Sequence, residues 1–214
     1  MYLVRTPALV KPLYGDLLWH LPREGNTVHL TFDDGPEPFV TPWVLDLLKA
    51  HGMQGTFFCV GRNALKHPEL VERITAEGHA LGNHTWDHLR GWGCADRQYL
   101  RNVLQCDALL HTPLFRPPYG RITRSQVASL RTRFRLVMWD VLSADFDPAL
   151  SGEQCAANVL NNVRPGSIVV FHDSSKAWDR LRVALPVVLQ ELVRRGLCSK
   201  ALSSGAQLTS TTSH

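Results

Sequence analysis

The sequence predicts an α/β fold built on a parallel sheet with helical crossovers. Short apolar runs alternate with helical segments along the whole chain of 214 residues. These runs are short and mainly apolar, as expected where helices cover both faces of a sheet. Roughly six or seven βα units indicate either a barrel or a doubly wound sheet.

In the first half of the chain, apolar periodicity separates strands from helices. Strands are predicted at 28–32, 56–60 and 79–82, and helices at 42–51, 68–77 and 97–111. Thr41 is the expected N-cap of the first helix, with Pro42 at its first helical position and Gly52 after its end. Gly78 ends the second helix in the same way.

The second half continues the alternation. Strands are predicted around Phe115 and at 135–139 and 167–171, and helices at 125–131, 155–163 and 181–195. No linker divides the chain, so one domain is expected at 26–200. Residues 1–25 would pack on it as an N-terminal segment, and the polar residues 201–214 would form a flexible tail.

Composition excludes several classes of protein. Hydrophobic residues make up 44% of the chain and charged residues 20%, values typical of a soluble domain. The net charge of +4 and the lack of a binding motif argue against nucleic acid as a partner. No apolar span long enough for a membrane and no secretory signal is present, which predicts a cytoplasmic protein and leaves peripheral membrane association open. Five scattered cysteines without a C-x-x-C pair indicate neither a disulfide framework nor a cysteine zinc site.

The most informative polar residues follow predicted strands. Asp33 and Asp34 end the first strand, and burying two carboxylates there requires a nearby cation. His84 and His88 follow the third strand four residues apart, so one helical turn would place both imidazoles on one side. Two histidines and one carboxylate make up a catalytic zinc site with an open position. Two histidines spaced as H-x-x-x-H usually lie on the surface without a shared function. The aspartates at 33 and 34 strengthen the interpretation of these two histidines as metal ligands.

Three later strands also run into polar or aromatic residues. Arg116 is followed by Pro-Pro-Tyr119-Gly120, and Trp139 precedes an acidic segment that contains Asp145 and Phe146. The strand at 167–171 leads into His172. In parallel α/β folds, all carboxyl ends of the strands face one side, where active sites are built. This convergence predicts an enzyme.

These segments together resemble the ordered motifs of the polysaccharide deacetylases, the chitooligosaccharide-deacetylase-like enzymes of carbohydrate esterase family 4. The matching segments are T-F-D-D-G-P at 31–36, H-T-W-D-H at 84–88, R-P-P-Y-G at 116–120, W-D-x-x-S-x-D-F at 139–146 and V-x-H at 170–172. The resemblance implies a single distorted (β/α) barrel of seven or eight mostly parallel strands. It also implies hydrolysis of acetyl groups from N-acetylated sugars.

The resemblance assigns a metal site and a catalytic pair. Asp34, His84 and His88 would hold one divalent metal, usually Zn²⁺, and such ligands also suit Co²⁺ or Ni²⁺. Asp33 would be the general base and Arg116 would orient it. This division would explain how two adjacent aspartates do different work.

The remaining roles concern the leaving group and the acetyl pocket. His172 would be the general acid, tuned by Asp145, and the N–H of Tyr119 would help to hold the oxyanion. Trp139, Phe146 and Val170 would shape the acetyl pocket. Phe146 and Val170 stand where many family members have Trp and Leu, so the groove is expected to differ in shape. Two alternatives remain open: an O-acetyl esterase or cytoplasmic non-sugar amidase, and a non-catalytic glycan-binding module.

Overall fold

The computed structural model describes residues 4–5 and 17–203, so residues 204–214 of the tail predicted at 201–214 lie outside the described range. Its strands are β1 (Thr27–Asp33), β2 (Gly55–Cys59), β3 (Ala80–Asn83), β4 (Leu114–Phe115), β5 (Arg135–Leu136), β6 (Val141–Leu142), β7 (Ile168–His172) and β8 (Cys198–Ser199). They run in the order β5-β4-β3-β2-β1-β7-β6, with β8 paired to β1. Every pairing between these strands is parallel.

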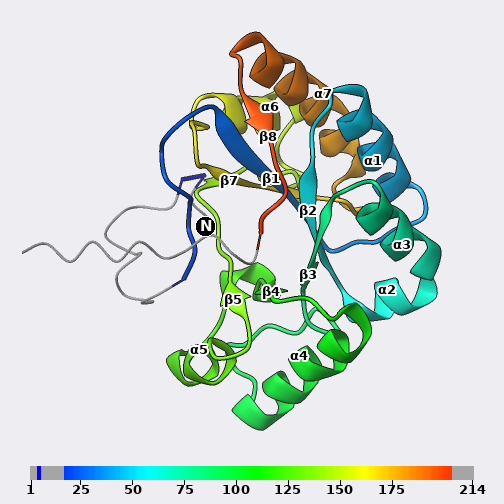
Figure 1. The fold of residues 1–214 in the computed structure, drawn as a ribbon, viewed down its shortest axis with the longest axis vertical. Helices are drawn as coiled ribbons and strands as arrows, with labels where there is room; N and C mark the ends of the chain where they lie inside the picture. The colour runs from blue at the N-terminus through cyan, green and yellow to red at the C-terminus, as the bar shows by residue number, and fades with distance from the viewer. Residues whose placement is uncertain (1–3, 6–16, 204–214) are drawn as a thin grey trace, which may run out of the picture.

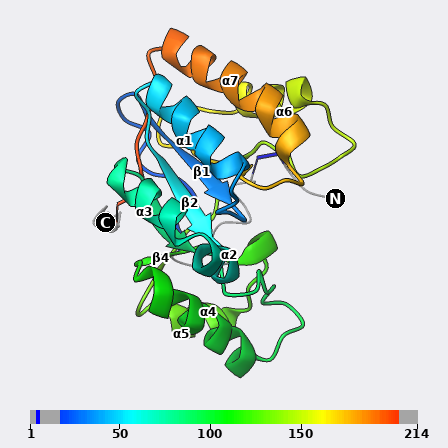
Figure 2. The ribbon, with the colours of Figure 1, turned by 90° about the vertical axis from the view of Figure 1, so that its right-hand side faces the viewer.

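The sheet curls into an incomplete barrel with helices on its outside (Figure 1). These helices are α1 (Val40–Ala50), α2 (Gly61–Lys66), α3 (Pro68–Ala76), α4 (Asp96–Leu110), α5 (Arg124–Leu130), α6 (Gly152–Leu160) and α7 (Trp178–Arg194). The view at right angles shows α1, α6 and α7 together on one side of the molecule and α4 and α5 at the opposite end (Figure 2). The predicted parallel α/β fold and its barrel form are confirmed. The alternative of a doubly wound open sheet is wrong.

The N-terminal segment connects the end of β5 to the start of β7. Leu18 pairs with Val137, just beyond β5, and His20 pairs with Ser167, just before β7. The side chains of Leu17, Leu18 and Trp19 are buried. Residues 17–20 therefore lie in the gap that the named strands leave. None of the helices in the described ranges is long and apolar enough to cross a membrane.

Strand alternation separates the core from the site. Phe32 of β1 stacks between Phe57 of β2 and Phe171 of β7, with ring centroids 5.0 and 6.2 Å apart. These rings belong to the core that α1 and α7 cover, and each buried ring stabilises the fold by roughly 1.5–3 kcal/mol. Neighbouring residues of a strand point to opposite faces. Thr31 and Asp33 therefore point into the barrel, away from that core.

Several element boundaries differ from the sequence prediction. The helix predicted at 155–163 begins at Gly152, because Ser151 and Gln154 form a capping box before it. The strand predicted at 135–139 ends at Leu136. Thr41 is not an N-cap, since α1 begins at Val40. The short elements α2, β6 and β8 were not predicted.

Candidate metal centre and active site

Asp33, the last residue of β1, forms a buried ion pair with Arg116, which directly follows β4. Arg116 Nη1 lies 2.6 Å from Asp33 Oδ1, and the arginine side chain is fully buried. Burial lowers the pKa of Arg116, and the charge and hydrogen bond of Asp33 oppose that shift. A buried ion pair is stable only where further hydrogen bonds satisfy the remaining donors and acceptors of both partners.

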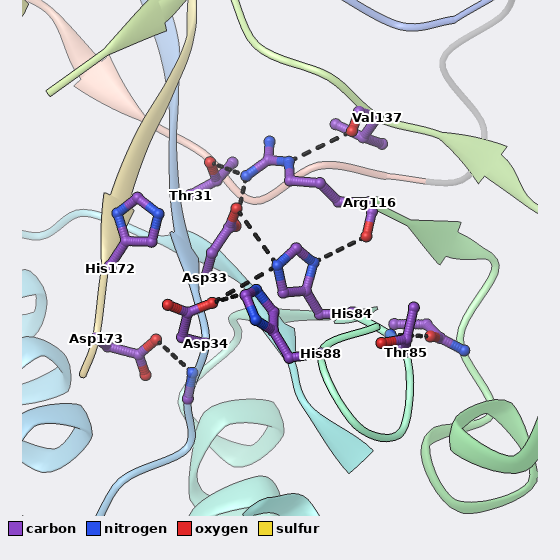
Figure 3. Close-up of polar contacts among 12 residues, drawn as sticks. Thr31, Asp33, Asp34, His84, Thr85, His88, Arg116, Val137, His172 and Asp173 are labelled. Carbon is purple, nitrogen blue, oxygen red and sulfur yellow. Dashed lines mark hydrogen bonds and ion pairs between the residues drawn. The ribbon is translucent and has the colours of Figure 1, made fainter. Parts of the chain in front are cut away.

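The guanidinium of Arg116 has such partners. It donates to the hydroxyl of Thr31 at 2.7 Å and to the carbonyls of Val137 and Met138 at 3.3 and 2.9 Å. Its carbon lies 4.1 Å from the centroid of the Phe58 ring, a cation–π contact. Arg116 is therefore fixed on all sides and holds Asp33 Oδ1, while Asp33 Oδ2 faces His84 Nε2 at 4.0 Å (Figure 3).

Asp34, His84 and His88 converge on one point (Figure 3). Asp34 Oδ1 lies 3.7 Å from His84 Nε2 and 3.0 Å from His88 Nε2. All three candidate ligand atoms lie within 4.8 Å of one another. Asp34 Oδ1 is buried without a hydrogen-bond partner among the described residues. A buried carboxylate oxygen without a hydrogen-bond partner, next to two imidazoles, fits the ligand set of a divalent metal ion such as zinc.

The protonation of these groups suits a metal site. Burial lowers the pKa of His84 to about 4, so the imidazole is neutral near pH 7. Burial alone would raise the pKa of Asp34, but His88, His172 and His84 hold it well below its usual range. His84 Nδ1 lies 2.8 Å from the Arg116 carbonyl, which leaves Nε2 facing Asp34. Metal binding requires these unprotonated forms.

Residues 84–88 form a loop, so the prediction of one helical turn for His84 and His88 was wrong. Thr85 and His88 have φ angles of 64° and 56°. Asn83 Oδ1 accepts from the Thr85 N–H at 2.9 Å, and Thr85 Oγ1 accepts from the Leu89 N–H at 2.8 Å. These bonds hold the loop so that the two imidazole centroids lie 5.1 Å apart.

His172, at the end of β7, lies beside the same centre (Figure 3). Its Nδ1 lies 2.7 Å from Asp145 Oδ1, and its backbone N–H donates to Asp145 Oδ2 at 2.9 Å. Burial alone would lower the pKa of His172. The charge and hydrogen bond of Asp145, with smaller contributions from Asp34 and Asp33, raise this pKa to about 9. His172 is thus protonated near neutral pH.

Asp173 is a buried residue of the site that was not identified from the sequence. Its Oδ1 accepts from the Gly35 N–H at 3.2 Å, and its Oδ2 accepts from the Thr41 hydroxyl at 2.6 Å. A Cβ on Gly35 would lie 2.1 Å from Asp173 Oδ2, so only glycine fits there. Burial raises the pKa of Asp173 to about 8, although the hydrogen bond from Thr41 opposes this. Asp173 thus ties β7 to the loop that follows Asp34.

Two of the predicted substrate-binding residues, Tyr119 and Phe146, lie beside the histidines, and the other two, Trp139 and Val170, pack together. The Tyr119 ring lies 4.6 Å from that of His88, and the Phe146 ring lies 5.3 Å from that of His172. Tyr119 belongs to the 3-10 turn η2 (Pro118–Gly120) and is 62% exposed. Val170 is buried in a small apolar cluster against which Trp139 packs.

Sequence similarity to known proteins identifies the family of this chain. The polysaccharide deacetylase family model matches residues 20–133, which include Asp33, Asp34, His84, His88 and Arg116. The chain belongs to the polysaccharide deacetylase family. A chitooligosaccharide deacetylase from Bradyrhizobium sp. is 34% identical over 191 residues, covering 80% of this chain and 86% of that protein. The family implied by the sequence motifs is thereby confirmed.

Two further relatives carry names that refer to peptidoglycan. A peptidoglycan-N-acetylglucosamine deacetylase from Bacillus cereus is 38% identical over 154 residues, which is 69% of this chain and 56% of that protein. This chain therefore matches just over half of that relative's length. A crystal structure of a peptidoglycan N-acetylglucosamine deacetylase in complex with a naphthalenyl N-oxidanyl-benzamide has a TM-score of 0.83 and 32% identity, and the match covers 92% of this chain and 95% of that one.

Proposed function

We propose that this protein is a metal-dependent hydrolase that removes acetyl groups from N-acetylated sugars, releasing acetate and a free amine. The observation that carries the proposal is the Asp34–His84–His88 triplet beside the Asp33–Arg116 pair. The names of the relatives support an N-acetylated glycan as the substrate. In this proposal Asp34, His84 and His88 hold one divalent cation, best suited to Zn²⁺, which when bound polarises the acetyl carbonyl and acidifies water.

Proton transfer is then divided between two of the chain's own groups. Asp33 takes a proton from the attacking water, and Arg116 pairs with the carboxylate and fixes its direction. The water oxygen bonds to the acyl carbon, the C–N bond breaks, and His172 supplies the proton that the leaving amine nitrogen needs. Asp145 is proposed to keep His172 protonated and oriented.

Other groups are proposed to bind the acetyl group. The Tyr119 N–H donates to the oxyanion that develops on the acyl oxygen. Phe146, beside His172, contacts the acetyl methyl group, and Trp139 and Val170, which pack together in a small apolar cluster, shape the same pocket.

A glycan panel tests the proposed function. Acetate release is measured from N-acetylglucosamine oligomers, peptidoglycan fragments and acetylated xylan, before and after chelation and after zinc is restored. We expect acetate from the N-acetylated substrates, loss on chelation, and recovery with zinc. Release from the xylan ester alone would identify an esterase, and glycan binding without any release would identify a binding module.

The Asp145–His172 pair predicts a specific pH effect. Asp145→Asn removes the charge that raises the pKa of His172, so this pKa should fall by about one unit or more. Because the general acid must be protonated, the alkaline limb of the kcat/KM profile should move to lower pH by the same amount. Asp147→Asn, two residues away, is the matched control. An unchanged alkaline limb in Asp145→Asn would show that His172 is not the acid.

A further inference from the structure

Positive charge is concentrated in one segment of this chain. Residues 90–135 contain nine arginines and two aspartates, with no lysine and no glutamate. The other 168 residues carry 14 basic and 17 acidic side chains. The segment contains α4 and α5, which lie together at one end of the molecule (Figure 2). This end is therefore strongly positive, while the rest of the chain is slightly negative.

Most of these arginines have no acidic partner. Arg116 is the exception at the barrel interior, where it is buried against Asp33. Just before the segment, Asp87 is already paired with Arg62 of α2. Six arginines of the segment are exposed and form no ion pair with any residue in the described part of the chain: Arg90, Arg97, Arg101, Arg121, Arg124 and Arg131.

The two aspartates of the segment join α4 to α5 and do not neutralise these arginines. Asp96, the first residue of α4, accepts from the hydroxyl of Thr123, the N-cap of α5, at 3.5 Å. Asp107, near the end of α4, is buried and pairs with Arg133 just beyond α5. The two helices therefore lie side by side. Asp96 is the one exposed carboxylate of the segment, all of which the structure describes.

The outward side of α4 combines arginine with leucine. Its residues recur every three or four positions and line one shallow depression: Arg97, Leu100, Arg101, Leu104 and Gln105. Leu104 is 44% exposed. The opposite side of the helix, with Tyr99 and Val103, is the buried one. Since a surface helix normally places its apolar residues toward the core, this second stripe on α4 is apolar surface left without a partner in the described structure.

An exposed tryptophan lies at the same end. Trp92, in the loop between β3 and α4, is 46% exposed. Its Nε1 donates to the Ile122 carbonyl at 2.9 Å, and the guanidinium carbon of Arg121 lies 5.7 Å from the ring centroid. The indole is thus fixed beside the start of α5. Tryptophan is enriched where lipid headgroups meet acyl chains, because its ring is apolar and its N–H is polar.

We propose that the face formed by α4, α5 and Trp92 binds the surface of a bilayer rich in anionic phospholipids. Guanidinium groups match phosphate oxygens in geometry as well as in charge. A helix that mixes basic and apolar side chains lies in the plane of the interface, with its apolar groups at the boundary of the acyl chains. A nucleic acid would satisfy the arginines alone, whereas a bilayer also covers Leu104 and its neighbours. This inference is independent of the proposed catalytic activity.

Cosedimentation of the full chain with vesicles tests the proposal. The vesicles consist of phosphatidylcholine alone or of an equal mixture of phosphatidylcholine and phosphatidylglycerol. We expect the partition coefficient for the mixed vesicles to be at least about 100-fold higher, because each arginine near an anionic surface contributes about fivefold. Salt near 1 M, where the screening length is about 3 Å, should remove most of this difference. Equal binding to both vesicles, or binding to neither, would overturn the proposal.

Charge variants assign the binding to α4. Arg97→Gln combined with Arg101→Gln should lower the partition coefficient on mixed vesicles about 30-fold, because two such contributions multiply. The matched control is Lys49→Gln combined with Arg182→Gln, on α1 and α7 at the other end of the molecule (Figure 2). It should bind like the unmodified protein. Equal losses in the two double variants would contradict a defined binding face, and thermal unfolding verifies that each variant is folded.

An apolar variant distinguishes a bilayer from a soluble polyanion. Leu104→Ser should lower the partition coefficient about fivefold, because less apolar surface leaves water. Val187→Ser, at a 45% exposed position on α7, is the matched control and should have no effect. Brominated acyl chains should quench the tryptophan fluorescence, and Trp92→Phe should reduce this quenching. Full binding by Leu104→Ser, without any quenching, would contradict the proposal and indicate a soluble polyanion such as a nucleic acid.

Discussion

Arg116→Met is expected to lower the free energy of unfolding by about 3–5 kcal/mol, because it leaves the Asp33 carboxylate buried without its charged partner. Methionine occupies a similar length but cannot donate to Asp33 or Thr31. Denaturant unfolding of the metal-free protein measures the loss without a contribution from bound cation. A large loss would show that this pair is also a structural element of the barrel interior.

Two comparisons separate the loss of charge pairing from other effects. Arg73→Met breaks ion pairs with Asp46 and Glu77 at the surface, each of which should contribute at most about 1 kcal/mol. The double variant Arg116→Met with Asp33→Asn should recover part of the stability lost in Arg116→Met, since no unpaired charge remains. If Arg116→Met were no more costly than Arg73→Met, the buried pair would not have the role assigned to it.

Asp33→Asn should reduce kcat for acetate release by about 10²–10⁴-fold, the usual contribution of a general base. The asparagine amide has nearly the shape of the carboxylate but cannot accept the proton from water. KM should change little, because Asp33 is 4% exposed and is proposed to act on water and not on the sugar. Steady-state acetate release on N-acetylglucosamine oligomers measures both constants.

The control for this variant is Asp46→Asn, which removes an exposed carboxylate on α1 far from the barrel interior. It should retain full activity. If kcat of Asp33→Asn stayed within about tenfold of the unmodified protein, another group would have to accept the proton. His172 would then be the first residue to examine, because it lies beside the same centre (Figure 3).

The sequence predicts those parts of the site that depend on strand periodicity. The alternation of Leu30, Phe32 and their neighbours sets the direction of Asp33, and the parallel order of strands brings His172 and Arg116 to the same end. These expectations need no knowledge of the loops. Motif resemblance added the separate roles proposed for Asp33 and Asp34, which periodicity alone does not distinguish.

The parts that the sequence did not predict depend on contacts between distant segments. The loop at 84–88 is fixed by Asn83 and by Asn102 of α4, whose amide oxygen accepts from the Trp86 N–H, so local spacing suggested the wrong conformation. Thr41 has the residue type of an N-cap, but its hydroxyl donates to Asp173, 132 positions away. Strands of two residues, such as β6 and β8, are too short to show a period.

The central claim is that two adjacent aspartates have different roles, Asp34 as metal ligand and Asp33 as base. The direct measurement is zinc bound per chain in Asp33→Asn and Asp34→Asn, each dialysed against the same zinc concentration. We predict that Asp33→Asn retains one zinc ion per chain without turnover, whereas Asp34→Asn loses the metal. Zinc lost from Asp33→Asn, or retained at full affinity by Asp34→Asn, would contradict this division of roles.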